Sequence, residues 1–255
     1  MKTAIPIFTA AMAVFCQAGS GQNAPAPAAD RFIETIETMK HSVAPLVCLA
    51  VNDDRAKILK RPGSAFFISD AGEFLTAAHV ILSMQTAECP VSALMIPVEN
   101  WRPEIRDEDL VWFLFRSADC RIDRRLDVAR CRSMDDLQAS MPRLRFRILP
   151  VKPEMSIPPD GTQVAVTGFP LGNRDPMTSR AGVAAYRTEW QNDEPVPELV
   201  LDRGAWPGSS GSPVYLSDGS VIGILIALGK EDGSALTIVR PVVLLREMLA
   251  ADPKK

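Results

Sequence analysis

Histidine is scarce in this sequence: there are only two, His41 and His79, among 255 residues. Neither these nor the five cysteines stand at the spacing of zinc ligands, so we expect no metal. No motif indicates an organic cofactor. A dominant charge is also missing, because the formal net charge is only −3. Nucleic acid and anionic membrane surfaces are therefore not indicated as partners.

Long apolar runs are absent after the N-terminus. There, Lys2 precedes an apolar stretch over residues 4–15, which is the pattern of a secretory signal. The stretch is too short to cross a bilayer as a helix, so we expect no stable membrane insertion. We predict a signal peptide over residues 1–18 and a linker rich in alanine and proline over 19–29. The protein should be exported, either to the periplasm or out of the cell.

Residues 30–255 are predicted to form one all-β domain, because short apolar segments follow one another at the density of a barrel. The expected strands cover residues 45–51, 63–69, 74–78, 92–98, 110–116, 146–151, 163–167, 178–190, 198–202, 213–216, 221–228 and 235–240. A helix over 31–39, capped by Asp30, should precede them, and a helix over 242–249 should close the chain. The crossover between two halves is placed at 133–143.

A turn rich in small residues lies between two apolar runs, over residues 203–213. Gly208 and Gly211 permit backbone angles that other residues resist, so the turn can expose one of its serine hydroxyls. Backbone N–H groups of such a turn can converge on one point, which acyl transfer requires. The alternative is an ordinary turn. The pattern is not the Gly-x-Ser-x-Gly elbow, because Ser212 stands where the last glycine should be.

Two further motifs precede this turn: Thr76-Ala77-Ala78-His79 and Leu126-Asp127-Val128-Ala129. Together with Gly208-Ser209-Ser210-Gly211-Ser212-Pro213 they give the order His, Asp, Ser. With these motifs the chain resembles the trypsin-like serine peptidase family, over about residues 31–249. It is most similar to the bacterial HtrA/Deg-like and glutamyl-endopeptidase-like branch, and we expect no PDZ domain. The resemblance implies two six-stranded antiparallel β-barrels with a short N-terminal helix and a C-terminal helix.

The resemblance also implies a role for each matching residue. Ser210 would be the nucleophile, His79 its general base, and Asp127 the carboxylate that orients the imidazole. The backbone N–H groups of Gly208 and Ser210 would form the oxyanion hole. The reaction implied is the hydrolysis of peptide bonds in a polypeptide substrate, through an acyl-enzyme.

Two departures from the family pattern keep a rival hypothesis open. Arg130 follows the Asp-Val-Ala motif where an apolar residue is usual, and Asp119 and Asp123 are alternatives to Asp127. Ile226 stands where many relatives have a hydroxyl that supports the aspartate. The rival is a catalytically weak or inactive pseudoprotease that acts as a binding module.

Substrate contacts can be inferred only through the resemblance. Gly204 and Ala205 should lie near the base of the primary specificity pocket. Ile226, Ala227 and Leu228 should form the strand that pairs with the substrate backbone. None of the five is charged, so a preference for Lys or Arg beside the cleaved bond is not supported, and a small or medium apolar side chain fits better.

Ser209 occupies the position where trypsin has the aspartate that receives a new N-terminal ammonium. A neutral hydroxyl cannot form that ion pair. Activation by insertion of the N-terminus is therefore not expected.

Four cysteines remain after removal of the signal peptide, and an even number in an exported chain favours disulfides. Three pairings are possible. We favour Cys48 with Cys89, which ties an early strand to the segment after the motif histidine. We pair Cys120 with Cys131, which closes a loop around the motif aspartate. The alternative is buried free thiols.

Overall fold

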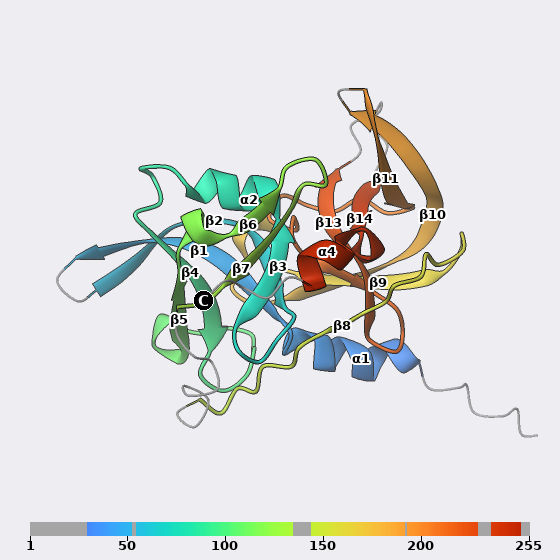
Figure 1. Ribbon diagram of the computed structural model, residues 1–255. Helices are drawn as coiled ribbons and strands as arrows, with labels where there is room; N and C mark the ends of the chain where they lie inside the picture. The colour runs from blue at the N-terminus through green and yellow to red at the C-terminus, as the bar shows by residue number, and fades with distance from the viewer. Residues whose placement is uncertain (1–29, 53–54, 135–143, 192, 229–235, 251–255) are drawn as a thin grey trace, which may run out of the picture. The chain divides into compact units, whose positions relative to one another are not determined.

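A computed structural model describes residues 30–52, 55–134, 144–191, 193–228 and 236–250. The predicted signal peptide, the predicted linker and most of the predicted crossover lie outside these residues. Figure 1 shows two groups of strands side by side, with β1 to β7 on the left and β9 to β14 on the right. The all-β class is confirmed.

The first barrel is an antiparallel sheet with the order β5-β4-β1-β2-β3-β7-β6. Six of these strands, from β5 through β4, β1, β2 and β3 to β7, form the barrel, which a bridge between Phe115 at the end of β5 and Ser133 after β7 closes. Among the described strands, the short β6 pairs only with β7 and lies outside the barrel. Its strands are β1 (Val43–Asn52), β2 (Arg55–Phe67), β3 (Glu73–Ala77), β4 (Val91–Pro97), β5 (Leu110–Phe115), β6 (Arg121–Asp123) and β7 (Val128–Arg132).

The second sheet has the order β12-β9-β10-β11-β14-β13-β8, and a pairing of β12 with β13 closes six of these strands. The short β8 pairs with β13 in parallel, outside the barrel. The expected two six-stranded barrels are therefore present, each with one extra short strand. The strands are β8 (Lys152–Pro153), β9 (Gln163–Gly168), β10 (Met177–Gln191), β11 (Glu194–Leu201), β12 (Pro213–Tyr215), β13 (Ser220–Leu228) and β14 (Thr237–Pro241).

The strand predicted over residues 146–151 is wrong. Phe146 and Ile148 are buried, which imitates the alternation of a strand. The backbone N–H groups of this segment, however, bond to carbonyls of separate elements: Leu149 to His41 and Val151 to Phe67. The segment is therefore an extended connection laid along the first barrel.

Both predicted helices are present. The N-terminal α1 (Arg31–Lys40) buries Phe32 and Met39 and is fixed to the second barrel by a hydrogen bond from Thr35 Oγ1 to the Ser217 carbonyl, 2.6 Å. The C-terminal one starts as a 3₁₀ turn, η5 (Val242–Leu245), and continues as α4 (Arg246–Ala250). The other short helices of the described residues are α2 (Ala78–Met84), η1 (Asp107–Asp109), η2 (Ser117–Asp119) and η4 (Pro170–Gly172).

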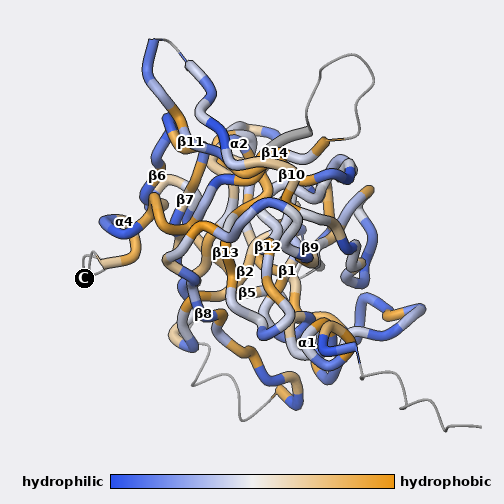
Figure 2. Tube along the Cα trace, turned by 90° about the vertical axis from the view of Figure 1, so that its right-hand side faces the viewer, coloured by the Kyte–Doolittle hydropathy of each residue, from blue (hydrophilic) through white to orange (hydrophobic). Residues whose placement is uncertain are grey.

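Apolar side chains explain why the strands close on themselves. Val43 to Leu49 of β1 are all buried, and Figure 2 shows hydrophobic stretches on many of the strands, while helix α1 carries both hydrophobic and hydrophilic residues. One buried cluster contains residues of both barrels, including Phe66 and Leu75 of the first and Tyr215 and Ile224 of the second. The barrels therefore share a continuous apolar core.

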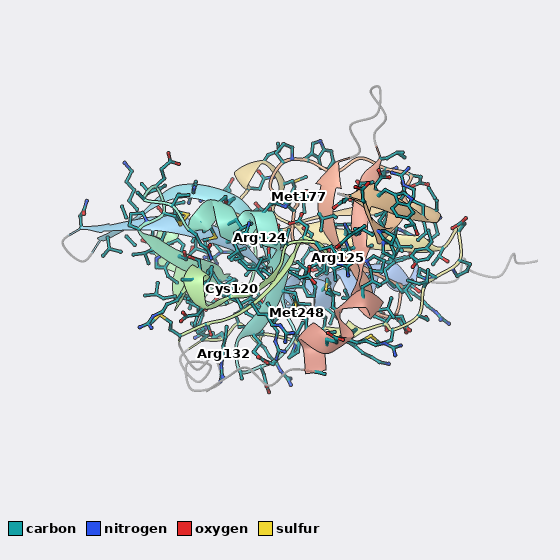
Figure 3. The ribbon with its side chains drawn as sticks, turned by 45° about the horizontal axis from the view of Figure 1, so that its top comes forward. Cys120, Arg124, Arg125, Arg132, Met177 and Met248 are labelled. Carbon is teal, nitrogen blue, oxygen red and sulfur yellow. A yellow bond between two sulfur atoms is a disulfide. The ribbon has the colours of Figure 1, made fainter. Side chains whose placement is uncertain are left out.

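The favoured disulfides are both formed. One joins Cys48 in β1 to Cys89, which precedes β4, and the other joins Cys120 to Cys131 in β7. The second bond closes the β6–β7 hairpin at its base (Figure 3 labels Cys120). Asp127 lies in the loop that this bond closes.

Main-chain contacts hold the two barrels together at the turn over residues 208–211. The Ser64 N–H of β2 donates to the Ser210 carbonyl at 2.8 Å. Gly211 has φ +88°, and a Cβ there would lie 2.0 Å from the Ser64 carbonyl oxygen and 2.3 Å from Thr76 Oγ1. Only glycine fits both the angle and the space.

Arg240 of β14 links the barrels at a second place. Its side chain is fully buried, and its Nε donates to the Leu126 carbonyl of the first barrel at 2.8 Å. Its Nη1 donates to the Pro197 carbonyl of the second barrel. Burial lowers the pKa of the Arg240 guanidinium, and the nearby Glu198 and Asp127 carboxylates oppose that effect. Arginine stays charged in proteins, so the cation is held by these groups.

Replacing Gly211 by alanine should lower the free energy of unfolding by about 4 kcal/mol, because it adds a steric clash to an unfavourable backbone angle. Gly161 is the matched control: it has φ +84° and no atom within 4 Å of an added Cβ. Gly161→Ala should therefore cost roughly 1–2 kcal/mol, the backbone term alone. Chemical denaturation of both variants measures the difference, and equal losses would contradict the tight contact.

Arg240→Met should lower the free energy of unfolding by about 3 kcal/mol, since it leaves the carbonyls of Leu126 and Pro197 without their charged donor. Arg145→Met removes a comparable cation whose side chain is 82% exposed and pairs with Glu99. That control should change stability by at most about 0.5 kcal/mol. Thermal and denaturant unfolding of the two variants test this. If Arg240→Met lowered the free energy of unfolding as little as Arg145→Met does, the buried arginine would not be stabilising the contact between the barrels.

Candidate active site

His79 is placed by a run of small buried residues at the end of β3. Thr76, Ala77 and Ala78 are all at most 1% exposed, so the chain packs closely there. Ala77 is extended with ψ 142°, and the chain turns into α2 at the next residue. The His79 side chain therefore leaves the first turn of α2 at the barrel edge, where it is 48% exposed.

The Asp127 carboxylate contacts both the backbone N–H and the imidazole ring of His79. Its Oδ1 accepts the His79 backbone N–H at 2.9 Å, and its Oδ2 lies 2.8 Å from Nδ1 of the ring. Its own carbonyl accepts the N–H of Ala78 at 3.0 Å. Because an ionised carboxylate only accepts, Nδ1 is the donor in this bond, and in the neutral imidazole Nε2 is then the acceptor.

The backbone of Asp127 is unusual, with φ +54°. Aspartate tolerates this left-handed conformation better than most residues. It occurs just before β7, at the end of the β6–β7 turn, where it aims the carboxylate at α2. Figure 3 labels Arg124 and Arg125 on this turn, and Arg125 reaches the Pro195 carbonyl of the second barrel at 3.4 Å.

The two alternative aspartates have other contacts. Asp123 Oδ1 accepts the Leu126 N–H at 2.8 Å and so shapes the turn. Asp119 lies 4.0 Å from Arg116. Neither is recorded in contact with the histidine ring within the described residues, so the geometry favours Asp127.

The unusual Arg130 has a structural explanation. It pairs with Glu73 at 2.7 Å, and both side chains are largely buried. It also donates to the Met248 carbonyl at 2.6 Å, so that it ties α4 to β3 and β7 (Figure 3 labels Met248). The departure from the motif therefore anchors the C-terminal helix.

The structure brings the turn of Ser210 to the histidine through Gly63. A Cβ at Gly63 would lie 2.7 Å from Val80 Cγ2 and 2.8 Å from the Ser210 carbonyl oxygen. Val80 follows His79 in α2, so both motif segments contact the same glycine. No hydrogen bond of the Ser210 hydroxyl is recorded among the described residues. Such bonds often tighten only when substrate is bound.

Two backbone donors beside Ser210 are left without an acceptor in the described part of the chain: the N–H groups of Gly208 and Ser210. The neighbouring N–H groups are used, since Ser209 donates to Trp206 and Gly211 to Leu225. Gly208 has φ +89°, and a Cβ there would lie 2.8 Å from the Phe169 carbonyl oxygen. Free, fixed donors of this kind can stabilise negative charge on an oxygen.

The three serines of the turn differ in accessibility. Ser209 is 6% exposed and Ser212 is fully buried, whereas Ser210 is partly exposed. Only the Ser210 hydroxyl among them combines exposure with the neighbouring free N–H groups.

The expected substrate-binding residues lie in two places. Gly204 and Ala205 line a cavity of about 380 Å³ together with Ser209 and Ser212, and Ile226 does not line it. Ile226 is 6% exposed and packs in the shared core. The cavity also contains two arginines, Arg180 and Arg203, and its described lining has no carboxylate.

The end of β13 has one unused edge. Leu225 exchanges hydrogen bonds with the turn, accepting from Gly211 at 2.7 Å and donating to Ser212 at 3.0 Å. Beyond it, Ala227 and Leu228 pair with β14 on one side, and no described strand pairs with the other side. An extended peptide could add itself to this edge.

Ser64 is a residue that the sequence analysis did not single out. Its hydroxyl donates to the Gly208 carbonyl and accepts the Phe169 N–H, both at 2.9 Å. The only sequence signal was its place after Gly63 in an apolar segment.

Within the described residues, no group of three metal-ligating side chains gathers, and no helix there is long and apolar enough to cross a membrane.

The fold is similar to that of solved protease structures. The chain is similar to the Rv3671c protease from M. tuberculosis in its active form, with 18% identity, TM-score 0.62 and coverage of 99% of this chain and 97% of that one. It is also similar to the MamO protease domain from Magnetospirillum magneticum in its apo form. There the identity is 15%, the TM-score 0.61 and the coverage 85% and 100%. No curated protein matches the sequence.

The model of the trypsin-like peptidase domain matches residues 63–224, which is more than half of the chain. That segment begins at Gly63, the glycine that contacts both Val80 and Ser210, and it contains His79, Asp127 and Ser210. The chain therefore belongs to the trypsin-like peptidase family, a family of serine-type endopeptidases.

Proposed function

We propose that the protein cleaves polypeptides with a triad of Ser210, His79 and Asp127, through an acyl-enzyme. The observation that carries this proposal is that both carboxylate oxygens of Asp127 contact His79: Oδ1 lies 2.9 Å from the backbone nitrogen and Oδ2 lies 2.8 Å from Nδ1. This contact leaves Nε2 free to accept a proton. The partly exposed Ser210 and the two unused N–H groups then supply the remaining parts of the chemistry.

In this mechanism His79 Nε2 takes the proton of the Ser210 hydroxyl while its oxygen attacks the substrate carbonyl. The carbonyl oxygen becomes negatively charged and accepts hydrogen bonds from the Gly208 and Ser210 N–H groups. The proton passes from His79 to the departing amine, and the peptide bond breaks. A water molecule then attacks the carbonyl carbon of the acyl-enzyme while His79 Nε2 takes one of its protons. His79 returns that proton to the Ser210 oxygen as the ester bond breaks, which releases the acid product and restores the serine hydroxyl.

The free edge of β13 supports an extended substrate on the acyl side of the cleaved bond. We assign Ile226, Ala227 and Leu228 to backbone pairing, and Gly204 and Ala205 to the neighbourhood of the specificity pocket. The absence of charge among these residues supports a small or medium apolar side chain beside the cleaved bond. The arginine-containing cavity behind Ser209 offers no carboxylate to an N-terminal ammonium among its described residues. This supports activity without trypsin-like activation.

We also propose that the protein works outside the cytoplasm, in the periplasm or as a secreted enzyme. Its two disulfides are of the kind that persists in oxidising compartments. The secretory pattern of residues 1–18 points the same way.

A binding module without catalysis remains the second candidate. It is favoured by Ile226, which offers no hydroxyl to Asp127, and by the absence of a recorded bond between Ser210 and His79 in the described residues. The two candidates differ in one observable: only the enzyme has a Ser210 that reacts with a fluorophosphonate.

Ser210→Ala should abolish labelling by a fluorophosphonate and lower peptide hydrolysis by roughly 10⁴-fold or more, without unfolding the protein. The control is Ser156→Ala, an exposed serine in a loop, which should keep both signals. Mass spectrometry of the labelled peptide and turnover of a casein substrate measure the effect. Wild-type protein that neither labels nor cleaves would establish the binding module instead.

Asp127→Asn should lower kcat by about 10⁴-fold, because an amide can donate to Nδ1 and so favours the wrong tautomer. Asp123→Asn, in the same turn, is the matched control and should stay within a few-fold of wild type, since its carboxylate bonds to Leu126. Steady-state kinetics and circular dichroism of both variants decide this. A dead Asp123→Asn beside an active Asp127→Asn would move the orienting role to Asp123.

A further inference from the structure

A groove of about 980 Å³ opens beside Gly208, on the side of the turn away from β13. Its walls are β2, the segment around η4 and the residues Pro207 and Gly208. Four cations line it, and Asp107 is the one carboxylate in its described lining. The cations are Lys57, Lys60, Arg61 and Arg174. A concentration of positive charge in a chain of net charge −3 requires an explanation.

The cations of the groove are only partly neutralised. Lys60 donates to the Ser83 carbonyl at 2.9 Å and lies 3.9 Å from the exposed Glu88. Arg61 donates from Nη1 to the Gly172 carbonyl at 3.0 Å, but its buried Nε has no acceptor in the described part of the chain. Arg174 pairs with Asp107 at 2.9 Å. Burial lowers the pKa of Arg61, the charge of Arg174 lowers it further, and Asp107 offsets part of the effect. The two guanidinium groups therefore repel each other, and an anion between them would relieve the repulsion.

The groove lies where the leaving half of a substrate would pass. Ser64 touches the Ser210 carbonyl, and β2 runs back from Ser64 along the groove to Lys57. The acyl half is assigned to the edge of β13, on the other side of the turn. At about 3.3 Å per residue, Arg61 lies roughly 10 Å along β2 from Ser64, within three residues of an extended chain. Figure 1 shows the β1–β2 hairpin, whose second strand lines the groove, reaching beyond the rest of the first barrel.

We propose that this basic groove binds aspartate and glutamate side chains that follow the cleaved bond in the polypeptide substrate. The inference rests on the proposed function, because it takes its direction from Ser210 as the nucleophile. Carboxylates fit the site better than a neutral peptide does, since guanidinium groups bind them through charge-assisted hydrogen bonds. Lys57 makes no ion pair among the described residues and remains available at the outer end.

The test uses internally quenched peptides that share one acyl half and carry three Glu, three Gln or three Lys residues after the cleaved bond. We expect kcat/KM to fall from Glu to Gln by about tenfold and from Gln to Lys by a further several-fold. The Glu preference should shrink at high salt, because the groove is open to solvent. An activated ester without a leaving peptide reports the triad alone.

The variants Lys57→Gln, Lys60→Gln and Arg174→Gln, combined, should reduce the Glu-to-Gln ratio of kcat/KM to about 2 or less. Lys152→Gln in β8 is the control, because Lys152 is exposed and does not line the groove. It should keep the full ratio. Because the readout is a ratio within one variant, a general loss of folded protein does not alter it.

Binding can be measured without turnover. A fluorescent peptide ending in three glutamates should bind Ser210→Ala more tightly than its glutamine analogue, and the combined groove variant should remove the difference. Equal kcat/KM for the three peptides in an enzyme that labels at Ser210 would overturn the groove proposal and leave the proposed function intact. Absence of labelling would overturn the function first. Stronger displacement by single-stranded DNA than by acidic peptide would assign the groove to phosphate.

Discussion

The hydrogen bonds of one serine, Ser64, hold the proposed nucleophile against the barrel that carries the histidine. Its N–H reaches the Ser210 carbonyl, and its hydroxyl connects the Gly208 carbonyl with the Phe169 N–H. Its own carbonyl accepts from Thr76 Oγ1 at 2.7 Å, three residues before His79. The two halves of the site come from different barrels, and Ser64 is the residue that contacts both of them directly. The other links between the barrels, Arg240 and the shared core, join them away from these motifs.

The parts of the site that could be predicted from the sequence are those with local signals. Small residues before His79, the Asp-Val-Ala motif and the glycine-serine turn each describe a tight backbone path, and their order predicted the family. The fold class followed from the density of short apolar segments, which does not depend on long-range contacts. The cysteine pairing agreed with the structure because each pair joins segments that are adjacent in the first barrel.

What could not be predicted depends on contacts between distant segments. The apolar residues Phe146 and Ile148 alternate with polar ones, which predicted a strand. The backbone N–H groups of this segment instead bond to carbonyls that lie in separate parts of the chain, so no strand forms. Arg240 lies in the apolar strand β14 and has no sequence feature that separates it from a surface arginine, although it is fully buried between the barrels. Three of the groove cations lie in β2 of the first barrel, and Arg174 follows η4 more than a hundred residues later. They come close together only because the two barrels pack against each other.

The partners of Arg240 are backbone carbonyls, those of Leu126 and Pro197. Every amino acid supplies a carbonyl, so a change of side chain at either partner position leaves the acceptor in place. The link between the barrels therefore depends on the identity of one residue and not of three. Mutational drift in the β6–β7 turn and in β11 can alter the rim of the candidate site without breaking the contact between Asp127 and His79. The same enzyme scaffold can in this way change what it presents to substrates while its two barrels stay joined.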